Sequence, residues 1–78
     1  MKLLILPILF NILFVDNKTN EPLTGVKVET QTKVYYSDFE GHVTIPNDEK
    51  VLKISYISYS DIKADSIKSD TLIRLNQL

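Results

Sequence analysis

The chain has 78 residues and a mass of 8.9 kDa, which suits one domain and is too short for a two-domain enzyme with a cleft between lobes. Its 44% hydrophobic and 24% charged residues are typical of a soluble globular chain and argue against disorder. Nine Lys and Arg against ten Asp and Glu argue against nucleic-acid binding, while the lack of Cys and the single His exclude disulfides, thiolate metal sites and multi-histidine zinc sites.

The N-terminal residues 1–15 read MKLLILPILFNILFV, an apolar run interrupted by Pro7 and Asn11. The run is shorter than the roughly 20 residues that a membrane span needs, and it has the length of the hydrophobic part of a signal peptide. No small residue suited to a cleavage site precedes Gly25. Two interpretations stay open: an export signal or membrane anchor, with membrane association through residues 1–15, or a buried first strand with a hydrophobic extension. We assign residues 1–11 to the signal-like or anchor segment and 12–78 to the folded domain.

From Asp16 onward, apolar and polar residues alternate in short runs separated by clusters of turn-forming residues. This pattern predicts strands rather than helices, because no segment here shows a period of 3.6 over ten or more residues. Their close spacing is typical of an all-β sandwich or small barrel. The strands are expected at residues 12–15, 26–30, 33–36, 42–45, 52–56 and 71–75, with a weak strand and a loop within 61–70.

Alternation also predicts which side chains form the core, since successive residues of a strand point to opposite faces. The expected buried face consists of Val26, Val28, Val43, Ile45, Leu52, Ile54, Tyr56, Ile73 and Leu75.

Four residues are expected to define the turns. Pro22 restricts φ in the polar segment before the second strand, and Gly25 lies where the chain enters that strand. Asp38 can accept hydrogen bonds from its own turn, and Gly41 can adopt a positive φ.

These segments together resemble the carboxypeptidase regulatory-like domain over roughly residues 12–76. The matching segments are Asp16 with TNEPLTGVKV (19–28), SDFEGHVTI (37–45), LKISYISY (52–59) and IRL (73–75). The resemblance implies a small Greek-key, transthyretin-like β-sandwich of about seven strands. The sequence departs from the family pattern at Ile12, Ser37, Val43 and Ser58, and Ser58 replaces a glycine, which would be costly if that position needs a positive φ.

The tyrosines are the most distinctive candidates for a binding surface. Tyr35 and Tyr36 are adjacent, so they point to opposite faces of the sheet and one of them should be exposed. Tyr35, Tyr36 and Tyr59 are therefore possible interface residues, against the alternative that they simply pack within the sheets.

No catalytic, cofactor-binding or metal-binding residue is predicted. The chain has no second His and no Cys that could act together with His42, and the alternation with Val43 directs the His42 side chain toward solvent. Asp38 and Glu40 are better explained by a turn than by a calcium loop, which needs six to eight oxygen ligands. The transthyretin-like hydrolases rely on several His and Arg residues and a C-terminal Tyr-Arg-Gly-Ser, whereas this chain has one Arg and ends in Leu-Asn-Gln-Leu.

The resemblance implies a non-catalytic accessory module of the cell envelope, located in the periplasm, at the outer membrane or outside the cell. Such domains form N-terminal extensions of TonB-dependent outer-membrane receptors. We therefore expect a protein partner, such as an outer-membrane receptor or secretion complex, and neither a cofactor nor a small-molecule ligand. The alternative is a β-sandwich that binds carbohydrate or peptide, which predicts exposed aromatic residues at one end.

Overall fold

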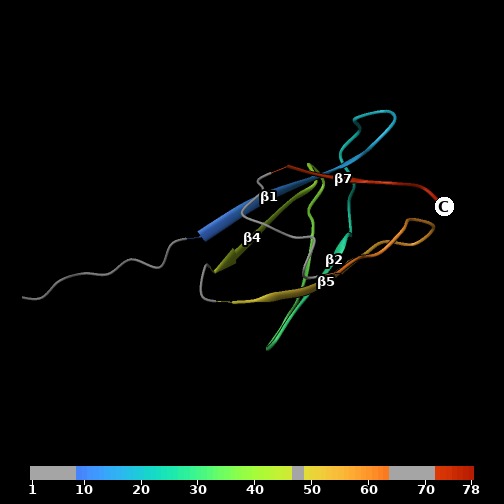
Figure 1. Cartoon of the computed structure of the whole chain (residues 1–78). Helices are drawn as coiled ribbons and strands as arrows, with labels where there is room; N and C mark the ends of the chain where they lie inside the picture. The colour runs from blue at the N-terminus through green and yellow to red at the C-terminus, as the bar shows by residue number, and fades with distance from the viewer. Residues whose placement is uncertain (1–8, 47–48, 64–71) are drawn as a thin grey trace, which may run out of the picture.

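Seven strands form the domain in the computed structural model, which describes residues 9–46, 49–63 and 72–78. Each strand coincides closely with a segment of alternating residues, and the described residues contain no helix (Figure 1). The strands are β1 (Leu9–Asp16), β2 (Lys27–Thr30), β3 (Val34–Tyr36), β4 (His42–Pro46), β5 (Val51–Ser55), β6 (Ile62–Lys63) and β7 (Leu72–Leu75).

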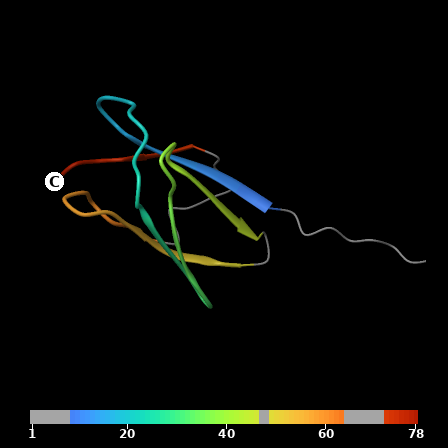
Figure 2. The same ribbon diagram turned by 180° about the vertical axis from the view of Figure 1, so that it is seen from behind.

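The strands form two sheets that pack as a small β-sandwich, which confirms the predicted fold class. One sheet has the order β4-β1-β7 and the other the order β3-β2-β5-β6. All neighbours are antiparallel except β1 and β7, which run parallel in a register that joins Leu13 to Leu72 and Asp16 to Leu75. β1 and β4 lie side by side in one layer in both views (Figures 1 and 2).

The core lies between the two sheets and consists of the side chains on the inward face of each strand. Phe14, Ile45 and Ile54 are among the largest of its side chains that are fully buried. Burying a side chain of this size contributes about 1.5–3 kcal/mol, so the alternation accounts for much of the favourable free energy of folding. The buried apolar residues are Ile12, Phe14, Val15, Leu23, Val26, Val28, Val43, Ile45, Ile54, Ile73 and Leu75.

Leu52 is an exception, and its predicted burial is wrong. On β5, Lys53 pairs with Glu29 and Val51 with Thr30, so Leu52 is an extra residue without a partner on β2. Such a β-bulge reverses the alternation beyond it. Val51 therefore packs against the core in place of Leu52, which is exposed.

β1 begins at Leu9, so the last three residues of the expected signal or anchor segment 1–11 belong to the strand. Leu9, Phe10 and Asn11 pair with Pro46, Ile45 and Thr44 of β4. Residues 1–8, which make up the rest of that segment, and the loop expected before β7 lie outside the described residues. Within the described residues, no helix is long and apolar enough to span a membrane.

Among the described residues, two other than glycine adopt a positive φ, Asn20 at 60° and Ser58 at 67°. The left-handed conformation costs a residue with a β-carbon about 1–2 kcal/mol, so Ser58 carries strain that a glycine at this position would avoid. Hydrogen bonds hold the strained turn on both sides: Tyr59 N donates to Tyr56 O at 3.0 Å, and Leu78 N donates to Ser58 O at 2.9 Å.

Candidate functional site

The strand directions gather several loops and the C-terminus at one end of the sandwich, which we call the loop end. β1, β3, β5 and β7 all finish here, and β2 and β4 begin here, as their registers require. In Figures 1 and 2, the C-terminus lies beside the loop after β5 and on the same side as the loop after β1. The loop end consists of residues 17–26, 37–41, 56–60 and 76–78.

Gly25 and Ser37 shape the entry to β2. Ser37 N donates to Val26 O at 3.0 Å and Gly25 N donates to Ser37 O at 2.9 Å, so Gly25 and Val26 together lie opposite Ser37. This is a bulge that requires its first residue to be left-handed, and Gly25 has a φ of 84°. The buried Ser37 hydroxyl accepts from Val26 N at 2.9 Å and donates to Leu23 O at 2.6 Å. Pro22, just before this segment, is exposed and bridges to Val15.

Asp38 closes the next turn with its own side chain. Its Oδ1 accepts from Glu40 N and His42 N, both at 2.9 Å, and its carbonyl accepts from Gly41 N at 3.0 Å. Gly41 has a φ of 82°. The turn thus holds Phe39 at its tip, where 90% of the side chain's surface is exposed.

Asp16 ties the remaining parts of the loop end together. Its carboxylate is 3% exposed and accepts four hydrogen bonds. Lys18 N and Thr19 N donate to Oδ1 at 2.7 and 3.0 Å. Tyr59 Oη and Gln77 Nε2 donate to Oδ2 at 2.6 and 2.9 Å. One carboxylate therefore fixes the loop after β1, the loop after β5 and the C-terminal segment.

The chemistry of Asp16 follows from these bonds. The Tyr59 hydroxyl, followed by the backbone N–H groups of Thr19 and Lys18, holds the pKa of this carboxyl far below its usual range. The same contact raises the pKa of the Tyr59 hydroxyl. A carboxylate that is ionised at all ordinary pH values and saturated with donors is a poor proton acceptor, so it acts as a structural anchor. Tyr59, a possible interface residue, has its hydroxyl in this network.

Tyr35 and Tyr36 point to opposite faces, as their adjacency requires. Tyr35 packs against the core, and its hydroxyl donates to Glu49. Thr32 Oγ1 also donates to Glu49, at 2.5 Å, and these bonds, with that of Thr32 the largest cause, lower the pKa of the Glu49 carboxyl. Tyr36 lies on the outer face and is 62% exposed. Of the three candidate interface tyrosines, Tyr36 is thus the one that presents its ring to solvent.

The loop end carries the most exposed apolar side chains among the described residues. Phe39 is 90% exposed, Ile57 84% and Leu78 89%, and Tyr36 enters the loop end from β3. We call these four residues the apolar rim. Exposed apolar residues gathered on one part of a surface are a mark of interaction sites. Of these four residues, only Tyr36 is among the interface residues predicted from sequence (Tyr35, Tyr36 and Tyr59), although an apolar residue at the tip of a polar turn, such as Phe39, was a usable signal.

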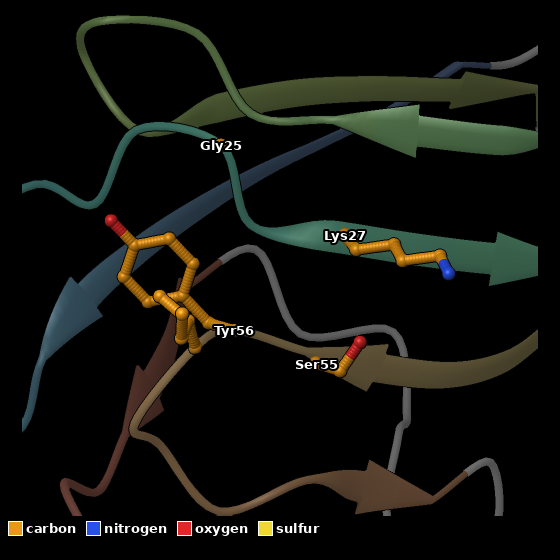
Figure 3. A pocket seen from close by; sticks show the side chains of 5 residues that line it. Gly25, Lys27, Ser55 and Tyr56 are labelled. Carbon is orange, nitrogen blue, oxygen red and sulfur yellow. The ribbon is translucent and has the colours of Figure 1, made fainter.

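A shallow hollow of about 360 Å³ lies beside the rim, between the start of β2 and the end of β5. Its lining consists of Gly25, Lys27, Ser55, Tyr56 and Ile57. Figure 3 shows the Tyr56 ring beside the chain at Gly25, with Lys27 and Ser55 on neighbouring strands. The hollow thus combines an aromatic ring and a hydroxyl, and it is open to solvent. The Lys27 ammonium points away from the Tyr56 ring and lies 3.5 Å from Glu29 Oε1.

The described residues contain no group of three or more His, Asp or Glu side chains that could hold a metal ion. His42 lies on the outer face of β4 opposite Leu13, the face that its alternation with Val43 predicts, and it is half-buried there. Its Nδ1 is buried without a hydrogen-bond partner among the described residues, so no acidic group orients the ring there.

Comparison with known proteins gives no relative: no family model, no curated protein and no solved structure matches this chain.

Proposed function

We propose that this chain is a non-catalytic interaction module of the cell envelope, of the carboxypeptidase regulatory-like type, that binds a protein partner through the apolar rim. The partner would be an envelope protein such as an outer-membrane receptor or secretion complex. The observation that carries the proposal is the gathering of Tyr36, Phe39, Ile57 and Leu78 at one end of the sandwich. The resemblance of the sequence motifs to that family supports the family and the location in this proposal.

The rim is well suited to binding because its loops are held in place before any partner arrives. Asp38 fixes the turn under Phe39, and the Tyr59–Asp16 contact fixes the loop that carries Ile57. Ordering a loop on association costs free energy, so a loop that is already ordered retains more of the energy of its contacts. Aromatic side chains on such loops are typical anchors of protein interfaces.

The proposal is tested by photo-crosslinking in living cells of the source organism. A photoreactive phenylalanine analogue replaces Phe39 or Ile57 in the full chain, and Thr44, which is exposed on β4, is the matched control position. We expect a discrete adduct with one envelope protein from positions 39 and 57 and none from 44. Adducts that form equally at all three positions, or a chain found in the cytosolic fraction, would count against the proposal.

The hollow supports a second candidate, a site for a glycan or an extended peptide. Tyr56 offers a stacking surface, and the hydroxyl of the neighbouring Ser55 can donate a hydrogen bond. Titration of the full chain with envelope glycans and peptides, followed by NMR, separates the two candidates. Chemical-shift changes confined to the hollow at millimolar ligand or below would favour the second candidate, and no change in that range would exclude it.

A further inference from the structure

We propose that the free edge of β3 pairs with β3 of a second copy of this chain, joining two four-stranded sheets into one. This self-association uses the backbone edge of β3, and it shares only Tyr36 with the apolar rim proposed above to bind a protein partner. Three features support it: the direction of the backbone N–H and C=O groups on β3, the side chains beside these groups, and the lower availability of the other sheet edges for pairing.

β3 is the last strand of its sheet, so one side of it has no neighbour among the described strands. In an antiparallel pair, hydrogen-bonded residue pairs alternate with pairs that are not bonded to each other. The bonds from Ser37 N to Val26 O and from Thr30 N to Lys33 O mark the bonded pairs of β2 and β3. The pairs Lys27–Tyr36 and Glu29–Val34 fall between them.

It follows that Val34 and Tyr36 direct their backbone N–H and C=O groups away from β2, toward the free edge. Both side chains are exposed on the outer face and both are uncharged. Edge strands usually avoid pairing by being very short, or through a charge, a proline or a bulge at the edge itself. β3 has only three residues, VYY, but carries no charge, proline or bulge.

The other edges are less available among the described residues. On β4, Asp38 occupies both backbone groups of His42, and Pro46 has no N–H. After β7, Asn76 O accepts from Ser60 N at 2.8 Å. β6 has only two residues. β3 is therefore the edge that best suits a new strand.

A second copy fits this edge because two β3 strands related by a twofold axis are antiparallel. With Val34 placed opposite Tyr36 of the second copy, every outward N–H meets an outward C=O. The facing side chains are then β-branched and aromatic, a favourable cross-strand combination.

The test uses the full chain in mild detergent, because the apolar residues 1–15 alone can drive association in water. Native mass spectrometry over a range of concentrations should show a monomer and a dimer of twice 8.9 kDa. Tyr36→Pro removes one outward N–H without touching a bond of the hairpin, and should weaken the dimer at least tenfold. Thr44→Pro is the matched control, because Thr44 is likewise exposed and outside the bonded pairs of its edge strand. A monomer at every concentration, or equal weakening by both variants, would overturn the proposal.

A second measurement covers the case in which Tyr36→Pro fails to fold. The chain has no Cys, so Val34→Cys and Tyr36→Cys chains can be mixed under mild oxidation. Opposed residues of an antiparallel pair lie within reach of a disulfide. The proposed register should therefore give a disulfide-linked dimer of the Val34→Cys and Tyr36→Cys chains. A mixture of Val34→Cys and Thr44→Cys chains should give no such dimer. Equal crosslinking in both mixtures would overturn the register. Protection of the Val34 and Tyr36 amides only when a strand of another protein is added would assign the edge to that protein and overturn the dimer.

Discussion

Gly25 and Gly41 provide a controlled comparison of backbone strain with steric overlap. Their φ values are 84° and 82°, so an alanine at either position suffers the same conformational penalty, about 1–2 kcal/mol. Their surroundings differ. A β-carbon at Gly25 would meet no atom within 4 Å, whereas one at Gly41 would lie 2.6 Å from the carbonyl oxygen of Phe14.

The neighbour at Gly41 has little freedom to move. Phe14 O already accepts from Leu23 N at 3.0 Å, and Phe14 N donates to Gly41 O at 2.8 Å. A shift of the Phe14 carbonyl would therefore disturb the contacts of β1 with two segments of the loop end. Forced overlap of this kind costs about 1–3 kcal/mol. We expect Gly25→Ala to lower the free energy of unfolding by about 1–2 kcal/mol and Gly41→Ala by about 2–5 kcal/mol.

Urea unfolding of both variants, followed by far-ultraviolet circular dichroism and tyrosine fluorescence, measures this difference. A domain of this size has a total stability of about 4–12 kcal/mol, so Gly41→Ala should remove a large part of it and Gly25→Ala a small one. Equal losses in the two variants would refute the reasoning, because they would mean that the overlap with Phe14 O relaxes without cost.

Three further predictions concern the anchors of the loop end and the first strand. Ser37→Ala should lower the free energy of unfolding by about 1–3 kcal/mol, since it leaves the buried N–H of Val26 without an acceptor, while Ser37→Thr should keep most of the stability in a thermal melt. The pKa of the Asp16 carboxyl is lower in the folded state than in the unfolded state. Its contribution to stability is therefore present above the unfolded pKa, about 3.9, and is lost as the pH falls toward the folded pKa. Thermal midpoints between pH 7 and pH 2 should therefore fall less steeply in Asp16→Asn, and an unchanged slope would contradict the assignment. Removal of residues 1–11 should destabilise the domain by about 1–3 kcal/mol more than removal of residues 1–8, because Leu9–Asn11 pair with β4. Equal chemical denaturation midpoints for the two shortened chains would show that this pairing contributes nothing to stability.

The alternation of side chains was enough to predict the strands and most of the core. Val26 and Val28, Val43 and Ile45, and Ile73 and Leu75 are buried as their spacing requires. The reason is that a strand repeats every two residues whatever its neighbours are. Leu52 shows where this local rule stops, because a bulge depends on how β5 is aligned with β2.

The turns were also accessible from sequence, since their chemistry is local. Asp38 bonds its own turn, and Gly41 supplies the conformation that a β-carbon would resist. The sequence also predicted that a serine at position 58 would be strained if its φ were positive. The structure shows a positive φ there.

The tertiary structure alone decided what the loop end contains. Asp16 meets Tyr59 and Gln77, which are 43 and 61 residues away along the chain, and no local pattern announces these contacts. Phe39, Ile57 and Leu78 reach the same end only because of the directions of β4, β5 and β7. Periodicity determines which way a side chain points within its own strand, whereas the pairing of distant strands determines which side chains become neighbours, and a surface for recognition depends on the second.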